Sequence, residues 1–365
     1  MAKYTFELIS PTETDWRQIE NAYDSSCYQS FKWYIYLKRI GIKPFIVKII
    51  EGNSLVGYFL GEKIWLPFPI IAAPIEGIGT YTQGLNMLVD TLVEQRTEIY
   101  KSLSEWVFNN NLALALQVDD WYLRIDSPTW IPTEDFHHDL LEKSNIAYSS
   151  RPTLYVNLNK PIDELWAATS YSSCKYCVHK AQKLGLYVRE IQHFEDIPAF
   201  CHQHYDQLKE VCVRKGTRPK LAQKESRMRA LCESLFPDRV LMLECVGKDE
   251  NGIEQVMSSG IFCFDKGQSA YWTGASYRRY QKYCPNELMV WEAMQLLHKR
   301  GATNLNLCGS AEYKLKFGTI YAYVPRLLFA KCSFLVNYTD NLKYLWRKLR
   351  RNTLDTIVHL FHNMK

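Results

Sequence analysis

The same succession of predicted elements occurs twice along this chain of 365 residues, and this repeat restricts the possible folds more than any other feature of the sequence. In the first half, apolar strands are predicted at residues 45–50 and 55–62, with a turn between them. Apolar side chains then recur at helical spacing from residue 88 to residue 107, and a further strand is predicted at residues 112–118. A hairpin that leads into a helix and then a strand is typical of an α+β module.

The second half of the chain repeats this order. Its predicted elements are strands at 240–246, 255–264 and 269–273, a helix that begins near Leu288, and a strand at 304–307. Gly301 follows the helix at a position that suits a left-handed C-cap. No Ser/Gly-rich linker separates the two halves, so we expect them to share an interface.

We therefore expect an α+β (mixed α/β) fold in which each half has a central mixed sheet flanked by helices. Three parts are predicted: an N-terminal domain at residues 1–155, a C-terminal domain at residues 156–335, and an amphipathic helix at residues 336–365. That helix carries Lys343, Arg347, Lys348, Arg350 and Arg351 with no acidic residue among them. It either docks on the protein and exposes a solvated basic face, or it binds anionic lipid or nucleic-acid phosphates.

Composition and missing motifs narrow the function classes. Hydrophobic residues make up 47% and charged residues 23% of the chain, as in globular proteins, which excludes a disordered or collagenous chain. The N-terminus lacks the pattern of a signal peptide, no apolar run is long enough to span a bilayer, and the 11 cysteines form no disulfide-like grid. We therefore expect a cytoplasmic protein with reduced thiols, which could also lie at the inner face of the plasma membrane. The sequence has no P-loop, Rossmann or nucleophile-elbow motif, which removes the main support for those classes.

One set of residues tests for a metal site. Cys174 and Cys177 form a C-x-x-C pair, and Cys201, His202 and His204 follow farther along the chain. Structural zinc sites place their ligand pairs on turns, whereas the segment around Cys174 has the pattern of a basic helix. We therefore expect ordinary buried thiols and no metal.

Two basic segments are candidates for binding an anion. Lys175, His179 and Lys180 lie on a predicted helix that Gly185 ends, either as a solvated charged face or as a cationic surface for a phosphate. The second segment is an aromatic and basic loop that precedes the helix near Leu288. Its candidate residues are Trp272, Tyr277, Arg278, Arg279, Asn286 and Glu287. A helix N-terminus offers unpaired N–H groups, and the two arginines would add charge-assisted hydrogen bonds, although Glu287 also suits plain capping.

Three blocks of this sequence resemble the Fem-type (FemAB-like) aminoacyl transferases and the related CelD-like acetyltransferase-domain proteins of the acyl-CoA N-acyltransferase (GNAT) superfamily. The first, CKYCVHKAQKLG, is similar to the family's R-x-x-I-R-K-A-x-K-x-G helix, with Lys175 and His179 in place of its arginines. The second runs from Pro285 to Ser310 and is similar to P-N-x-L-x-W-E…G…F-D-x-G-G, with Asn306 in place of the aspartate. The third, YKLKFG, is similar to F-K-x-x-F-G.

The resemblance implies two tandem GNAT-like domains and an acyl or aminoacyl transferase without a tightly bound cofactor. The donor would be acyl-CoA or aminoacyl-tRNA, and the acceptor an amine or hydroxyl of a cell-envelope precursor, such as a lipid-linked muropeptide or an exopolysaccharide. Both are anionic, in accord with a formal charge of +5. Lys314 would bind a phosphate or stabilise developing charge, Phe317 would line the donor site, and Asp119 would orient the incoming amine.

Two departures keep a different function class open. Cys284-Pro285 occupies the place of the G-x-G pyrophosphate loop found in acetyl-CoA enzymes, and Asn306 and His179 replace charged residues of the family pattern. The alternative is a non-catalytic binding module of the same fold that grips tRNA or lipid phosphates. The sequence identifies neither the transferred group nor the acceptor.

Overall fold

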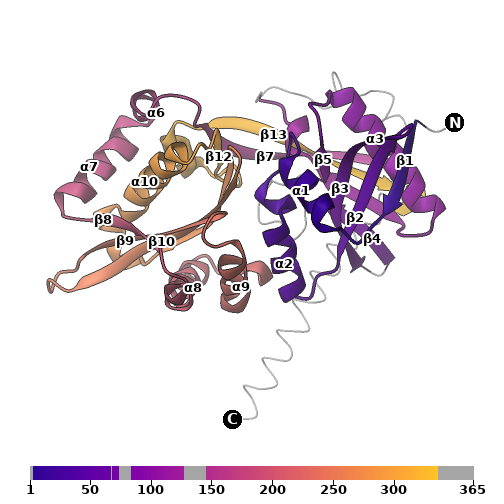
Figure 1. Cartoon of the computed structure of the whole chain (residues 1–365). Helices are drawn as coiled ribbons and strands as arrows, with labels where there is room; N and C mark the ends of the chain where they lie inside the picture. The colour runs from indigo at the N-terminus through magenta and orange to yellow at the C-terminus, as the bar shows by residue number, and fades with distance from the viewer. Residues whose placement is uncertain (1–2, 67, 74–83, 127–144, 336–365) are drawn as a thin grey trace, which may run out of the picture.

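The computed structural model describes residues 3–66, 68–73, 84–126 and 145–335 of the chain (Figure 1). Within these residues it has a 13-stranded mixed sheet with helices on both faces, which confirms the expected α+β fold class. The predicted C-terminal helix at 336–365 lies outside the described residues.

The first half of the chain forms one end of the sheet. Its strands are β1 (Tyr4–Leu8), β2 (Pro44–Glu51), β3 (Ser54–Leu66), β4 (Phe68–Ala73), β5 (Leu85–Met87) and β6 (Ala115–Asp119), and its helices are α1 (Glu13–Asn21), α2 (Phe31–Arg39) and α3 (Val93–Asn109). The predicted start of this helix at residue 88 was wrong, because α3 begins at Val93. The amide of Leu88 donates to the carbonyl of Val56 at 3.0 Å, so this residue extends the sheet contacts of β5. The helix begins only after Leu92, whose amide donates to the side chain of Gln95.

The second half supplies the other end of the sheet. Its strands are β7 (Ile146–Asn157), β8 (Tyr187–Glu190), β9 (Val240–Lys248), β10 (Glu254–Asp265), β11 (Gln268–Ser276), β12 (Asn304–Asn306) and β13 (Ile320–Ala330). Its helices are α6 (Ile162–Ala168), α7 (Tyr176–Lys183), α8 (Ile197–Arg214), α9 (Glu225–Leu235) and α10 (Pro285–Lys299), and a single π-helical turn (Tyr171–Lys175) leads into α7. Gly301 follows α10 with φ of 82°, as its predicted capping role requires.

The two halves are joined through β7 and β13. The strand order is β1-β2-β3-β4-β6-β13-β7-β12-β11-β10-β9-β8, so β13 lies between β6 of the first half and β7. In Figure 1 these two strands run from one half of the molecule into the other. Residue 155, where we place the domain boundary, falls within β7, and Tyr155 pairs with both Ile320 and Asn306.

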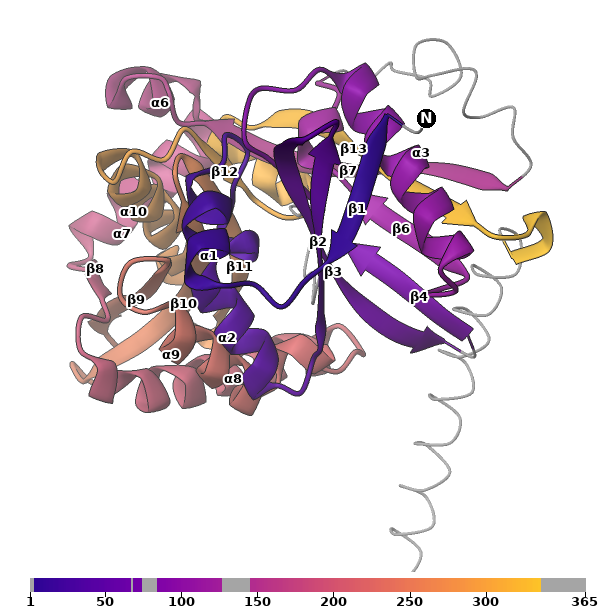
Figure 2. The ribbon, with the colours of Figure 1, turned by 45° about the vertical axis from the view of Figure 1, so that its right-hand side comes forward.

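Three large groups of buried side chains hold the layers together. One lies between α3 and the sheet of the first half, and a second lies between α7, α10 and one face of the other sheet end. The third joins α2 to α8 and α9, which lie beside it in Figure 2, and to the opposite face of the sheet. Trp33, Phe200 and Trp272 are buried there. Burying a large apolar side chain contributes about 1.5–3 kcal/mol, so this third group fixes the first half against the second.

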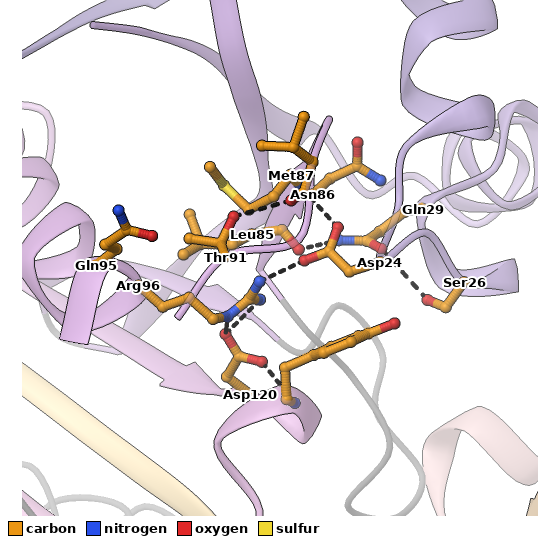
Figure 3. A network of polar contacts seen from close by, with 12 residues as sticks. Asp24, Ser26, Gln29, Leu85, Asn86, Met87, Thr91, Gln95, Arg96 and Asp120 are labelled. Atoms are coloured by element: carbon orange, nitrogen blue, oxygen red, sulfur yellow. Dashed lines mark hydrogen bonds and ion pairs between the residues drawn. The ribbon is translucent and has the colours of Figure 1, made fainter. Parts of the chain in front are cut away.

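A buried ionic network orders the loops of the first half (Figure 3). The guanidinium of Arg96 on α3 donates to Asp24 at 2.5 Å and to Asp120 at 2.7 and 3.0 Å. Asp24 also accepts the amide of Met87, and Asp120 accepts the amide of Tyr122. Because all three charged side chains are buried, the network connects the turn after α1, β5, α3 and the end of β6 in one arrangement.

Candidate active site

The sheet opens where β11 and β12 separate. These parallel strands pair only from Gln268 to Ala270, although β11 continues to Ser276. A β-bulge lies at Trp272, because Phe262 pairs with Tyr271 whereas Ile261 pairs with Thr273. A bulge bends its strand and increases its twist, so β11 turns away from β12 and leaves a gap in the sheet.

The bulge also determines which helix layer the side chains of β11 face. Tyr271 and Gly274 face the layer of α10, whereas Trp272 and Thr273 face the layer of α8. A Cβ atom at Gly274 would lie 1.6 Å from the hydroxyl oxygen of Tyr271, so only glycine fits beside this ring.

A pocket of about 290 Å³ lies in this opening. Its walls come from the C-terminal end of α8, the last residues of β11, the first turn of α10, and the turn at Glu312–Phe317. Among the described residues that line it, the cations are Arg214, Lys215, Lys314 and Lys316, and the acid is Glu287. This surplus of positive charge favours an anionic ligand.

Lys314 is the most constrained cation of the pocket. Its ammonium donates to the carbonyl of Leu307 at 2.5 Å and to that of Cys308 at 3.0 Å. Burial and the positive charge of Lys215 lower the pKa of Lys314, whereas Cys308 opposes this shift. Within the described part of the chain the ammonium has these two acceptors, so its third N–H remains available to a ligand.

The N-terminus of α10 forms the opposite wall of the pocket. Pro285 occupies the first helical position, and Asn286 and Glu287 of the same turn line the pocket. Asn286 donates to the hydroxyl of Ser276 at 2.9 Å, and Glu287 forms an ion pair with Lys316. The free N–H groups of this turn add to the positive potential.

A buried histidine fixes α8 against the sheet. His204 Nδ1 lies 2.7 Å from Ser259 Oγ, and this hydroxyl donates to Gln207 at 2.5 Å, so Nδ1 carries the proton. Burial lowers the pKa of His204 to about 3, and the ring is neutral at physiological pH. The same helix ends in Arg214 and Lys215, so the network holds both cations at the pocket.

The structure brings together only part of the set of residues predicted from sequence. Lys314, Phe317, Asn286 and Glu287 all line the pocket. Phe317 is buried, and the following Gly318 has φ of 69° and packs so closely on Ala168 that a Cβ would approach it to 3.0 Å. Trp272 is instead buried in the core on the α8 face, because side chains alternate along β11 and its neighbour Tyr271 faces the α10 layer.

The predicted arginine loop lies outside the pocket. Arg278 and Arg279 are exposed, and Arg279 stacks on Tyr277 and Tyr280 beside a separate shallow hollow lined by Asp249 and Glu250. The hydroxyl of Tyr277 accepts a hydrogen bond from Gln203. The cations beside the helix N-terminus are therefore supplied by α8 and by the turn around Lys314.

The predicted basic residues of the π-helical turn and of α7 lie outside the pocket, and two of them lie beside Trp166. Lys175 donates to the carbonyl of Ala167 at 3.0 Å, and its ammonium is 6.0 Å from the centroid of the Trp166 ring. The exposed His179 lies 5.4 Å from the same ring, and Lys180 is half-buried. This arrangement matches the solvated-face interpretation more closely than a pocket wall.

Asp119 lies at the seam between the two halves. Arg326 of β13 donates to its two carboxylate oxygens at 2.6 and 2.5 Å, and Arg151 of β7 donates at 3.0 Å. The carboxylate is fully buried and is not part of the pocket lining. Its contacts join β6, β13 and β7.

Sequence reasoning did not single out Arg214 and Lys215. The signal was present, since these residues begin a basic stretch, Arg214 to Lys220, at the end of the segment that forms α8. A periodic sequence pattern predicts a helix, but it does not predict which strand the end of that helix lies against. Only the fold shows that this basic stretch lies next to β11.

The ligands considered for zinc are also separated in space. Cys174 and Cys201 are buried in different core groups, and His204 is bound to Ser259. The described residues instead bring Cys177 near Cys284 and Glu287.

Comparison with known proteins assigns a domain of the GNAT transferase class to part of the chain. Residues 170–315 match the family model described as the acetyltransferase (GNAT) domain, so the chain carries a GNAT acetyltransferase domain. No curated protein matches the sequence.

Solved structures extend the likeness to most of the chain. The crystal structure of FemX matches with a TM-score of 0.61 at 14% identity, covering 87% of this chain and 96% of FemX. A tandem GNAT protein from the clavulanic acid biosynthesis pathway matches with a TM-score of 0.49 at 10% identity, covering 89% and 98%. L-PGS from Bacillus licheniformis matches with a TM-score of 0.49 at 10% identity, covering 87% and 96%. The likeness to FemX confirms the Fem-type fold over both halves.

Among the residues that the structure describes, no helix is both long enough and apolar enough to cross a bilayer.

Proposed function

We propose that this protein transfers an acyl or aminoacyl group from an anionic activated donor to an amine or hydroxyl of a cell-envelope precursor. The observation that supports this most directly is the position of Lys314, a buried ammonium with one free N–H group in a cationic pocket where the sheet opens. The fold that the chain shares with FemX is in accord with this class of reaction.

The chemistry needs a stabilised oxyanion. The acceptor amine or hydroxyl attacks the carbonyl carbon of a thioester or ester, and the carbonyl oxygen gains negative charge. In our proposal the free N–H of Lys314 donates to that oxygen, and the two main-chain carbonyls keep the ammonium in place. When the bond to the donor breaks, the leaving sulfur or oxygen takes a proton and the acceptor loses one.

The donor would lie between α8 and the first turn of α10. Arg214, Lys215 and Lys316 supply positive charge for a phosphate, and Asn286 lies at the helix N-terminus that faces it. Both acyl-CoA and aminoacyl-tRNA carry such phosphates next to a reactive carbonyl. A lipid-linked muropeptide and an exopolysaccharide precursor are the acceptor classes that we propose.

The acceptor-orienting role predicted for Asp119 is less well supported. An approaching amine would compete with Arg326 and Arg151, which already bind both carboxylate oxygens. We propose instead that Asp119 holds β6, β7 and β13 together where the two halves meet.

A donor panel tests the proposal. The full-length protein is incubated with radiolabelled acyl-CoA or aminoacyl-tRNA, with and without a lipid-linked muropeptide, and the label in the acceptor is counted. Transfer that depends on Lys314 supports the proposal. If a donor binds tightly but no acceptor is labelled under any pairing, the non-catalytic binding module becomes the better account.

A further inference from the structure

Three side chains with metal-binding atoms meet where α7 packs against the start of α10. Cys177 is on α7, Cys284 directly precedes α10, and Glu287 lies in its first turn. Their two sulfurs and one carboxylate oxygen all lie within 4.8 Å of one another. Over the part of the chain that the structure covers, no other three Cys, His, Asp or Glu side chains gather this closely.

Cys284 has an unusual backbone conformation, and its side chain does not cap the helix that follows it. Its φ of 60° and ψ of 40° are left-handed, which is uncommon for a residue other than glycine. A residue at this position usually accepts a hydrogen bond from the first turn of the helix, but the thiol of Cys284 makes no such bond. The thiol lies instead beside Cys177 and Glu287.

The charges around the group would balance a divalent cation. Glu287 is already paired with Lys316, and both are largely buried. Two thiols that lose their protons to solvent would contribute two negative charges, which a divalent cation neutralises. Lys180 adds a positive charge close enough to act on the Cys284 thiol.

We propose that Cys177, Cys284 and Glu287 bind a thiophilic divalent cation of the zinc class. Two thiolates and one carboxylate are ligands that zinc accepts, and three protein ligands leave the fourth tetrahedral position to water. The ion would tie α7 to the first turn of α10, where Asn286 and Glu287 line the pocket. It would thereby stiffen one pocket wall without contacting Lys314.

Cobalt is the probe for this site, because thiolate–Co²⁺ bonds give charge-transfer absorption. The full-length reduced protein is titrated with Co²⁺, and Zn²⁺ is added afterwards. We expect one Co²⁺ per chain with a thiolate charge-transfer band that Zn²⁺ abolishes. Cys177→Ser and Cys284→Ser should each weaken Co²⁺ binding at least tenfold and reduce the band. Glu287→Gln should weaken binding while both sulfur ligands keep the band.

A matched control separates this site from adventitious thiol binding. Cys332 is an exposed cysteine outside the group, so Cys332→Ser should leave the stoichiometry and the band unchanged. Zn²⁺ should also raise the Tm of the wild-type protein and of Cys332→Ser, but not that of Cys284→Ser. These shifts are read against the metal-free Tm of each variant, so a loss of folding is recognised directly.

Several results would overturn the proposal. They are the absence of a charge-transfer band in the reduced wild-type protein, a band that survives in both Cys177→Ser and Cys284→Ser, and a band that disappears in Cys332→Ser. A Cys177–Cys284 disulfide whose reduction yields no Co²⁺ binding would equally assign the pair to another use.

Discussion

The ammonium nitrogen of Lys314 lies 2.5 Å from the carbonyl oxygen of Leu307, the residue that directly follows β12. A side chain from one turn is thus fixed to the main chain at the place where the sheet opens. Since the same ammonium also contacts the carbonyl of Cys308, its position does not depend on a bound ligand. This is the preorganisation that stabilisation of a developing negative charge requires.

Replacing Lys314 tests this role. Lys314→Met keeps the length of the side chain and removes the ammonium, so kcat should fall by about 10²–10³-fold, as when one oxyanion donor is lost. The measurement is transfer under saturating donor, with circular dichroism as the check on folding. Lys316→Gln, two residues away in the same turn, should change the donor KM more than kcat. Equal turnover by Lys314→Met and the wild type would remove this lysine from the mechanism.

Two pairs of basic residues distinguish the two possible donor positions. Arg214→Ala/Lys215→Ala removes two pocket cations and should raise the donor KM about tenfold or more, with a weaker dependence on salt. Arg278→Ala/Arg279→Ala removes the exposed pair outside the pocket and should leave the donor KM nearly unchanged. Donor titrations at two salt concentrations measure both effects. The reverse ranking of the two variants would move the donor site to the loop around Tyr277.

The ionic network of the first half should dominate its stability. Arg96→Met leaves Asp24 and Asp120 buried without their cation, which should lower the free energy of unfolding by about 3–5 kcal/mol. The exposed pair of Arg17 and Glu13 is the control, and Arg17→Ala should cost less than about 0.5 kcal/mol. Urea unfolding gives both values. A similar small loss in the two variants would mean that the buried network adds little.

His204 should make the protein sensitive to mild acid. Its folded-state pKa of about 3 lies below the ordinary 6.5, so the stability that it contributes is present above pH 6.5. This contribution declines as the pH falls from 6.5 toward 3, by at most about 1.4 kcal/mol per pH unit. The free energy of unfolding of the wild type should therefore fall between pH 6.5 and pH 5, relative to His204→Gln.

The comparison with His204→Gln is needed because Asp24 acts in the opposite direction. Burial raises the pKa of Asp24 to about 6, against the opposing effect of Arg96, so its protonation favours the folded state as the pH falls. Both proteins contain Asp24, and the difference between them isolates the histidine. If the free energies of unfolding of the two proteins changed in parallel with pH, protonation of His204 would not destabilise the folded state.

Local patterns in the sequence predicted the elements of the second half well. The strands at 240–248 and 254–265 and the helix that ends before Gly301 agree with the structure within a few residues, because alternation, helical spacing and glycine act over short distances. Two of the three motif blocks contain Asn286, Glu287 and Lys314, which the structure brings together in one pocket.

What the sequence missed depends on distant pairing. Trp272 was predicted as a donor-site residue together with the loop that follows it, whereas the structure buries it on the α8 face of β11. The bulge at Trp272 exchanges the faces of the residues after it, which local alternation does not predict. The basic end of α8 reaches the pocket only because His204 docks that helix on β10 and β11. The local sequences of α8 and of the two strands do not predict this contact.

The place of β13 has a consequence for how the chain is made. The ribosome synthesises β6 about two hundred residues before β13, the strand that pairs with its second edge, as Val118 and Leu327 illustrate. During that interval the nascent first half carries an open sheet edge, which is prone to pairing with other chains. We therefore expect the first half to mature only when translation is nearly finished, and premature termination before β13 to leave both halves incomplete.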